Sequence, residues 1–333
     1  MKQVYVLFFL FIYLFFGQVS WAQKSDKEVK DSIKTVEKKR KEFLKTFEYY
    51  VYIPPGTLEE RVEEKDGNFE TKKTPIKEFY MYSTELDNFG YLEFLYSLKN
   101  KGSKDYEKML PDTNVWISDL SYNEPYVQHY FRHPAYMNYP VVGVSYEQAT
   151  AYCEWITDIF NEGPFDTFKE VKFRLPTEAE WTYAARGGLL YSDYPWGGPY
   201  LRNAQGQALA NCLMIGTENV YRDTLYKKNE EGDYEEVFIY RADGAGSYMG
   251  VAGALNDAAD VTAPVTAYNP NGFGLYNMAG NVSEMVLEEG ISKGGSWRDP
   301  GYYLKNDVHQ TYEGRNSSSS KRGFRMIFEV IEY

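Results

Sequence analysis

Asn269-Pro-Asn-Gly-Phe-Gly-Leu-Tyr-Asn-Met-Ala-Gly-Asn-Val-Ser-Glu284 is the most informative segment of this 333-residue chain. Three shorter motifs accompany it: Arg174-Leu-Pro-Thr-Glu-Ala-Glu-Trp181 before it, and Gly294-Gly-Ser-Trp297 and Gly323-Phe-Arg325 after it. Beyond Gly188 the chain is rich in Gly, Pro and Asn and has few periodic stretches. This composition predicts long, ordered loops held by something other than regular strand ladders.

The four motifs, in this order, resemble the sulfatase-modifying-factor family, which includes the formylglycine-generating enzymes. The resemblance implies an α+β fold: a formylglycine-generating-enzyme (C-type-lectin-like) domain with a twisted antiparallel sheet, few helices and long ordered loops. It also implies the place of the family's two reactive cysteines, two and seven residues beyond the aromatic residue of the Gly-Gly-Ser-aromatic motif. Those positions hold Asp299 and Leu304 in this chain.

The replaced cysteine pair argues against the oxidase chemistry of the family. That chemistry needs a thiolate pair that holds copper(I), a soft metal suited to sulfur ligands. Asp299 is a hard oxygen donor, Leu304 donates nothing, and no cysteine follows Cys212 in the sequence. We therefore expect a noncatalytic protein, a pseudoenzyme, that binds no copper.

The first residues and the overall charge indicate an exported, acidic protein. Lys2 precedes an apolar run, and a polar, small-residue stretch ends at Ala22, so residues 1–22 are interpreted as a cleavable signal peptide. The chain has a formal net charge of −12, which argues against nucleic acid or anionic lipid as a partner. No cysteine lies at the cleavage point to carry a lipid anchor.

The rest of the chain is predicted to hold one domain after a charged lead-in. Residues 23–48 are dense in Lys and Glu with apolar residues at broadly helical spacing, so they form either an amphipathic helix or a solvated linker. Residues 49–333 form the sulfatase-modifying-factor domain. Within it, residues 222–250 are interpreted as an insertion that folds as a hairpin, because a polar tip is flanked by an apolar run.

Local signals predict several elements of this domain. Strands are expected over residues 49–56 and 171–175. Capping boxes at Ser145-Tyr-Glu-Gln148 and Thr177-Glu-Ala-Glu180 predict two helix starts. A further helix is expected to begin at Asn88, with a buried face formed by Phe89, Leu92, Leu95 and Tyr96.

The family resemblance also implies two structural Ca²⁺ sites in the loops, since Ca²⁺ prefers six to eight oxygen ligands from carboxylates, amides and backbone carbonyls. One site would use the side chains of Asn277 and Glu284 with the carbonyls of Gly280 and Val282. The other would use the side chains of Asn211 and Asp257 with the carbonyls of Cys212 and Ala259.

Other candidate sites are weaker. His129 and His133 are four residues apart, but the Glu of a zincin motif is absent and Pro134 discourages a helix there, so a structural or surface role is favoured. Cys153 and Cys212 could form a disulfide in an oxidising compartment. Two separate buried thiols are an equally good interpretation.

One segment narrows the family resemblance further. Leu110-Pro-Asp-Thr-Asn-Val-Trp116, Tyr122-Asn-Glu-Pro125 and Tyr130-Phe-Arg-His-Pro-Ala-Tyr136 resemble the gliding-motility and type IX secretion lipoproteins of the GldK/PorK kind and their GldJ relatives. This resemblance implies a periplasmic scaffold, associated with the outer membrane through protein partners and built into an oligomeric assembly. Aromatic residues of this segment, Trp116, Tyr122, Tyr126, Tyr130 and Tyr136, would suit an interface, or they would fill a loop-rich core.

Two other functions stay open at this point. The same C-type-lectin-like fold presents variable loops on a rigid frame, so a carbohydrate- or peptide-binding module is the main alternative. A formylglycine-generating-type oxidase is the third and is disfavoured by the missing cysteine pair.

Overall fold

The computed structural model describes residues 34–63, 69–117, 123–163, 168–213, 220–228, 233–242, 259 and 261–332, apart from residues 35, 36, 39, 42 and 46. The chain divides into two units, residues 1–43 and 44–333. The described residues between 34 and 45 are helical. The expected signal peptide lies outside the described residues.

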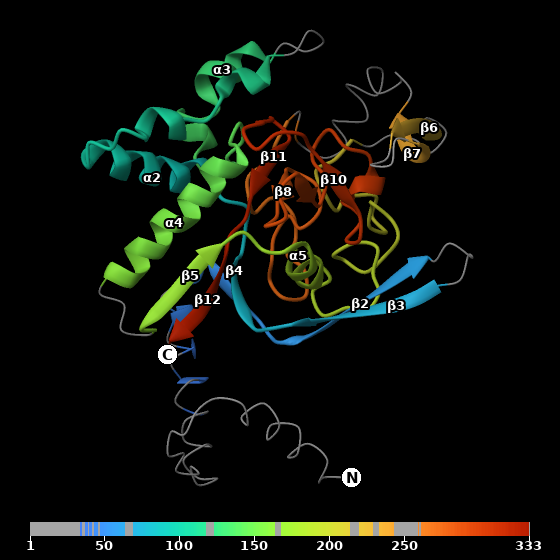
Figure 1. The fold of residues 1–333 in the computed structure, drawn as a ribbon, viewed down its shortest axis with the longest axis horizontal. Helices are drawn as coiled ribbons and strands as arrows, with labels where there is room; N and C mark the ends of the chain where they lie inside the picture. Colours follow the sequence, from blue (N-terminus) through green and yellow to red (C-terminus); the bar gives the residue numbers. More distant parts are fainter. Residues whose placement is uncertain are drawn as a thin grey trace. The chain divides into compact units, whose positions relative to one another are not determined.

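The second unit is built on a four-stranded antiparallel sheet. Its strands are β1 (Tyr50–Ile53), β4 (Phe79–Tyr82), β12 (Ile327–Glu332) and β5 (Glu170–Arg174), in the order β1-β4-β12-β5. Helix α4 (Tyr146–Glu162) runs beside β5 (Figure 1). The α+β class predicted from the sequence is confirmed, and β1 and β5 lie where strands were expected.

A second, smaller sheet is made of short strands between the loops. It has the order β10 (His309–Thr311), β9 (Ile291–Lys293), β8 (Ser283–Met285) and β11 (Arg322–Phe324), with β11 parallel to β8 and the other pairs antiparallel. Only two residues separate β11 from β12. One short segment of chain therefore contributes a strand to each of the two sheets.

Two hairpins stand apart from these sheets. One pairs β2 (Gly56–Glu63) with β3 (Phe69–Ile76), and the other pairs β6 (Val220–Lys228) with β7 (Tyr234–Ala242). The second hairpin is the one predicted for the insertion, although it begins and ends somewhat earlier than residues 222–250.

Both predicted capping boxes are present. The Ser145 hydroxyl accepts the Gln148 amide at the start of α4, and the Thr177 hydroxyl accepts the Glu180 amide at the start of α5 (Glu178–Ala185). In each box the fourth residue also accepts the amide of the first, so two backbone donors are satisfied at each helix start. The shorter helices are η1 (Tyr106–Met109), η2 (Thr113–Trp116), α3 (Glu124–His129), η3 (Pro134–Tyr136) and η6 (Gly301–Leu304).

Helix α2 (Asn88–Asn100) begins where expected, but its buried face differs from the prediction. Phe89 and Tyr96 are 56% and 69% exposed. Leu95 is buried as predicted and Leu92 is half-buried, but the other buried hydrophobic side chains are Tyr91 and Phe94. Their aromatic rings pack against Tyr152 and Trp155 of α4, which explains why that face turns inward.

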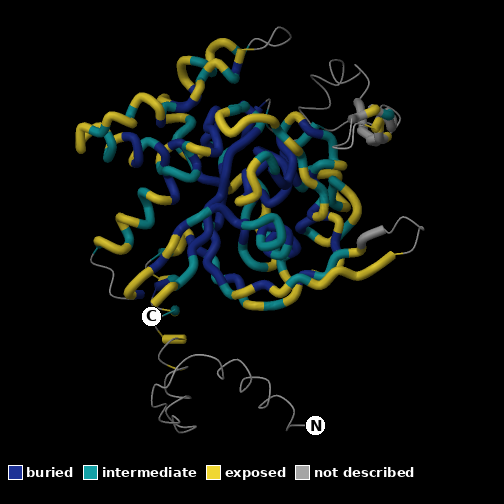
Figure 2. Tube along the Cα trace, viewed as in Figure 1, coloured by how far each residue is buried: buried dark blue, intermediate teal, exposed yellow. Residues whose placement is uncertain are grey.

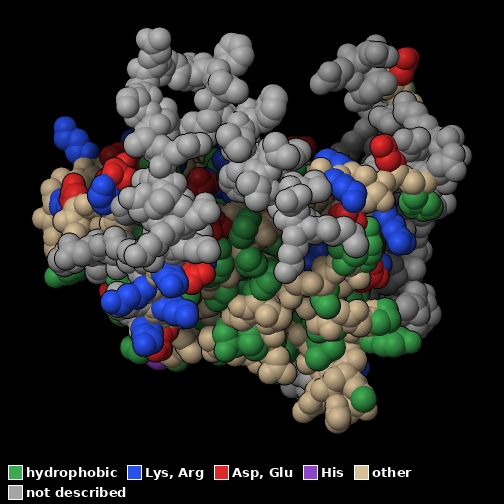
Figure 3. Space-filling view, turned by 90° about the horizontal axis from the view of Figure 1, so that it is seen from below, with side chains coloured by type: hydrophobic (Ala, Val, Ile, Leu, Met, Phe, Trp, Pro, Cys, Tyr) green, Lys and Arg blue, Asp and Glu red, His purple; other side chains and the backbone are tan. Residues whose placement is uncertain are grey.

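The main core lies between α5 and the large sheet. Trp181 of α5 is fully buried there, and the surrounding side chains are Ile53, Phe79, Met81, Ala184, Ala185, Leu275, Met278, Val286 and Ile327. Figure 2 shows buried chain concentrated around β4, β8, β11 and β12, with exposed residues along the outer helices and hairpins. On the face drawn in Figure 3, Lys and Arg lie toward both sides while hydrophobic and uncharged side chains cover the middle.

Candidate functional site

The loop from Asn277 to Glu284 turns sharply through backbone conformations with positive φ. Asn277, Gly280 and Asn281 have φ of 50°, 77° and 64°. A Cβ atom at Gly280 would lie 2.3 Å from the carbonyl oxygen of Asn211, so only glycine fits. The Asn281 amide donates to that same carbonyl at 2.7 Å. Asn211, which belongs to the second predicted calcium set, therefore lies directly beside the loop that supplies the first.

Glu284 is fully buried and paired with Arg325. The Arg325 Nη2 atom is 2.7 Å from Glu284 Oε1, and the side chains are 0% and 1% exposed. Trp181 Nε1 donates to the other carboxylate oxygen at 2.7 Å. Arg325 also donates to the carbonyls of Tyr82 and Tyr276, so its guanidinium ties the loop to β4. This pairing joins two of the sequence motifs.

A second buried carboxylate, Glu85, contacts Asn277 and Asn281 of the same loop and was not anticipated from the sequence. Its oxygens accept hydrogen bonds from the side-chain amides of Asn277 at 3.1 Å and Asn281 at 2.9 Å. Burial raises the pKa of Glu85 to about 8; Arg325 opposes the rise and Glu284 adds to it. Glu284 is the carboxylate that pairs with the guanidinium, and Glu85, held by two amides, favours its neutral form.

The first predicted set of calcium ligands contains one buried oxygen that could bind a hard cation, Asn277 Oδ1. Asn277 is 5% exposed, and its Oδ1 atom has no hydrogen-bond partner among the described residues. A buried acceptor of this kind normally has a partner. Glu284 already accepts four hydrogen bonds from Trp181 and Arg325, close to the capacity of a carboxylate, so a cation here would have to share its oxygens with Arg325. No cluster of three or more His, Cys, Asp or Glu side chains occurs in the described part, so a cation here would depend on amide and carbonyl oxygens.

The second predicted set is only partly within the described residues. Asn211 is buried, and its amide nitrogen donates to the Val261 carbonyl at 2.8 Å. Cys212 and Ala259 are half-buried. Asp257 lies outside the described residues, so this set stays a prediction.

The positions of the family's cysteine pair are occupied by residues with structural contacts. Asp299 is 5% exposed, accepts a hydrogen bond from the Ser296 hydroxyl and lies 3.4 Å from Lys321 Nζ. Leu304 is fully buried in a small apolar cluster with Tyr194, and Cys212 packs against that cluster. Asp299 is thus neutralised within the fold, and Leu304 fills a core position.

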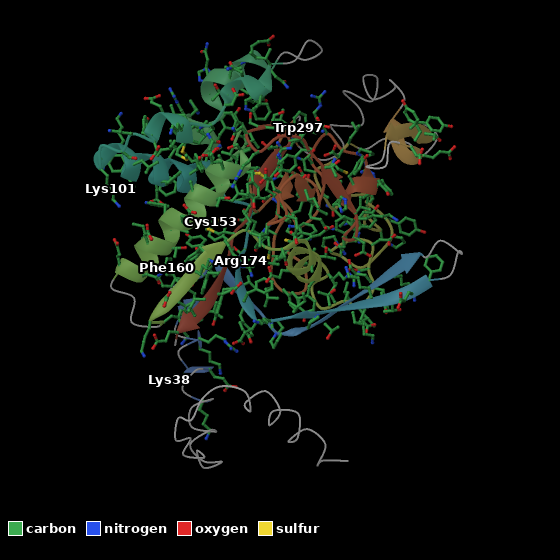
Figure 4. All side chains as sticks on the ribbon, in the orientation of Figure 1. Lys38, Lys101, Cys153, Phe160, Arg174 and Trp297 are labelled. Carbon is green, nitrogen blue, oxygen red and sulfur yellow. The ribbon has the colours of Figure 1, made fainter. Side chains whose placement is uncertain are left out.

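The aromatic segment 116–139 mostly fills the core beside this region. Trp116 and Tyr130 are 2% and 1% exposed, and their ring centroids are 4.6 Å apart. Tyr126 and Tyr136 are half-buried against them, and Tyr122 lies outside the described residues. Trp297 of the Gly-Gly-Ser-Trp motif, which lies near β11 (Figure 4), stacks on Trp116 at 6.2 Å. For Trp116 and Tyr130 the core-filling alternative therefore holds.

A second polar cluster runs from the core to the surface. The Lys293 side chain is 1% exposed, lies over the Trp181 ring at 5.7 Å and reaches Glu178 at 3.3 Å. Glu178 also contacts His309 Nδ1 at 2.9 Å. Burial lowers the pKa of Lys293, and Glu178 opposes that effect. No sequence motif indicated this cluster, because its members are far apart in the chain.

The remaining candidates have ordinary roles. His129 ends α3, and His133 caps η3 by accepting the backbone amide of Ala135 at 3.2 Å. Both side chains are exposed at the surface. Both cysteines are described, and no disulfide joins Cys153 to Cys212. None of the helices in the part of the chain that the structure describes has the length and apolar character needed to cross a membrane.

The sequence of this domain is similar to those of formylglycine-generating enzymes. The formylglycine-generating enzyme of Mus musculus is 26% identical over 295 residues, which are 81% of this chain and 63% of that protein. The inactive C-alpha-formylglycine-generating enzyme 2 of Bos taurus is 30% identical over 241 residues, which are 66% of this chain and 59% of that protein. The chain thus spans less than two thirds of the length of either relative.

Among solved structures, the crystal structure of CarF covers 84% of this chain and 97% of its own, with 18% identity and a TM-score of 0.48. The family assignment comes from the sequence match. Residues 35–330 match the model of the sulfatase-modifying factor enzyme 1-like domain, and the chain belongs to that family.

Proposed function

We propose that this protein is a noncatalytic interaction protein built on a formylglycine-generating-enzyme-like domain. The observation that carries the proposal is that Asp299 and Leu304 occupy the positions of the family's two cysteines. Asp299 is held by Ser296 and Lys321, and Leu304 is enclosed in an apolar cluster. Neither position offers the soft ligand that copper(I) requires.

The two cysteines that the chain does have are poorly suited to replace the pair. Cys153 is buried in α4, and burial raises the pKa of its thiol, which disfavours the reactive thiolate. Cys212 packs beside the Leu304 cluster but supplies one thiol where the family uses two. One of the relatives, the bovine enzyme 2, is itself named inactive. A noncatalytic role is therefore the better fit to these residues.

An exposed apolar stripe on α2 supports a role in protein association. Phe89 and Tyr96 are seven residues apart, which places them on one helical face, and Leu92 lies half-buried between them. Large exposed aromatic side chains that share one face are a common feature of protein interfaces. This stripe is our candidate contact surface for a partner.

We further propose that the partner belongs to the type IX secretion and gliding apparatus, and that the protein acts as a periplasmic scaffold near the outer membrane. This part rests on the resemblance of residues 110–136 to the GldK/PorK and GldJ proteins and on the signal-like residues 1–22. A structural Ca²⁺ at Asn277 and Glu284 belongs to the same proposal, supported by the unpartnered Asn277 Oδ1.

A mild crosslink and pull-down from the native envelope tests the scaffold role. We expect near-stoichiometric recovery of secretion-ring proteins with the wild type. Recovery should be lost with the double variant Phe89→Ser/Tyr96→Ser and kept with Phe69→Ser, a matched control because Phe69 is 68% exposed on β3. Recovery of the wild-type protein alone would overturn the scaffold role.

The absence of catalysis is tested separately with reconstituted protein. We expect no conversion of a cysteine-containing sulfatase peptide in the presence of copper(I), and no copper retained after dialysis. Formation of formylglycine above a protein-free control would overturn the noncatalytic assignment.

A further inference from the structure

We propose that the cleft between the loops 195–209 and 267–279 binds a neutral saccharide. Its volume is about 390 Å³, which lies within the range of small-molecule sites, roughly 300 to 1,000 Å³. Neither Asp299 nor Leu304 lines the cleft, although Ala279 and Trp196 of its lining pack in the same apolar cluster as Leu304. The inference is independent of the scaffold role.

The lining of the cleft is uncharged. None of the fifteen described residues that line it is Asp, Glu, Lys, Arg or His, although a quarter of the whole chain is charged. Instead, the lining combines Trp196 and Tyr268 with prolines and the side-chain amides of Asn and Gln. None of these side chains can neutralise an anionic or cationic ligand, so without a cation at Asn277, which is also a lining residue, the surface favours a ligand without charge.

The walls of the cleft are held in place before any ligand arrives. The Asn271 amide nitrogen donates to the carbonyls of Ala184 and Ala185, and its oxygen accepts two backbone amides of its own loop. Trp196 stacks on Tyr194 with centroids 4.9 Å apart and planes 5° from parallel. Its Nε1 atom donates to the Tyr200 carbonyl, which fixes the ring. Little conformational entropy would be lost on binding.

Two amides remain available to a ligand. Asn269 is exposed, and its side chain makes no hydrogen bond within the described part of the chain. Gln207 uses its oxygen to accept the Asn203 amide and keeps its nitrogen as a donor. An amide can both donate to and accept from a sugar hydroxyl. The ring face of Trp196 that does not stack on Tyr194 supplies apolar surface for the C–H face of a pyranose ring.

A sugar fits this cleft better than a peptide. Both lining segments are loops without strands, so they offer no sheet edge on which an extended peptide could add a strand. The lining also has no charged group to hold a peptide terminus or a charged side chain. Hydroxyl groups arranged around an apolar ring match amides arranged around aromatic faces.

Calorimetry with neutral and charged oligosaccharides tests the inference. The probes are cellotetraose, mannotetraose and chitotetraose, with tetragalacturonate and a proline-rich decapeptide for comparison. We expect at least one neutral probe to bind the wild type. Asn269→Ala should weaken that binding by about threefold to tenfold, the effect of one lost hydrogen bond. Ala267→Glu, which places a charge at the exposed rim, should abolish it.

Asn316→Ala is the matched control, because Asn316 is exposed on a different loop and does not line the cleft. It should bind like the wild type. Circular dichroism melting of each variant separates loss of binding from loss of fold. The inference is overturned if no neutral probe binds, if the peptide or tetragalacturonate binds in preference, or if a folded Ala267→Glu variant binds as well as the wild type.

Discussion

The buried carboxylate Glu85 should make this protein less stable as the pH rises through neutrality. It is fully buried, and the structure raises its pKa to about 8 from an ordinary value of 4.5. Between these two values the folded protein keeps a proton that the unfolded chain releases. Because the folded state binds more protons, the free energy of unfolding falls with increasing pH across this window.

The magnitude follows from the proton linkage. One bound proton corresponds to about 1.4 kcal/mol per pH unit where the folded group is protonated and the unfolded group is ionised. From pH 5.5 to 7.5, Glu85 alone should therefore lower the free energy of unfolding by roughly 2 to 3 kcal/mol. Glu178 and Glu180 have lowered pKa values, so their effects on stability are confined to more acidic solutions.

The perturbation is Glu85→Gln, which keeps the shape of the side chain and removes its titration. Asn277 can turn its unpartnered Oδ1 toward the new amide, so the absolute stability should change by only about 1 kcal/mol. The readout is the slope of stability against pH from urea unfolding in chelator. Glu154→Gln, at an exposed position of α4, is the matched control. Equal slopes in the wild type and Glu85→Gln would refute the reasoning.

Four further substitutions test separate features. Asn277→Gly removes Oδ1, and glycine tolerates the positive φ at this position. The melting temperature of this variant should therefore be the same in Ca²⁺ and in chelator, whereas that of the wild type should be higher in Ca²⁺. A Ca²⁺-dependent shift like that of the wild type would exclude Asn277 as a ligand. Thr177→Ala removes the hydroxyl that caps α5 and should cost about 0.5 to 2 kcal/mol in urea unfolding, and no loss would mean that the cap is dispensable. Arg325→Met leaves Glu284 buried without its counter-charge and should cost about 3 to 5 kcal/mol. In contrast, the exposed pair of Lys305 with Asp193 should contribute less than about 1 kcal/mol, as Lys305→Met would show.

Features that depend on neighbouring residues were predictable from the sequence. The capping boxes at Ser145 and Thr177 are complete within four residues, and both helices begin there. The start of α2 was correct for the same reason, since Asp87 accepts the Gly90 amide. The buried face of α2 was predicted correctly for Leu95 and wrongly for Phe89 and Tyr96, because these two are as apolar as Tyr91 and Phe94. The tertiary contacts of Tyr91 and Phe94 with α4, Phe131 and Met109 decide which rings turn inward.

The contacts within the candidate site could not be predicted either, because they join residues that are distant in the sequence. The motifs indicated that Asn277, Glu284 and Arg325 matter, but nothing in their spacing showed that Arg325 would neutralise Glu284. Glu85 lies almost two hundred residues before Asn277 and Asn281, and no local pattern distinguishes it from a surface carboxylate. Long-range pairs of this kind become visible only when the two sheets have brought their loops together.

The short link between β11 and β12 has a consequence for how the protein folds. Both strands follow all the other strands of the two sheets in the sequence, yet β11 borders β8 in one sheet and β12 lies between β4 and β5 in the other. Until that segment is available, β4 pairs only with β1, and β5 has no strand to pair with. Because most of its strand pairing joins residues distant in sequence, the domain should fold late and as a whole rather than in stages during synthesis.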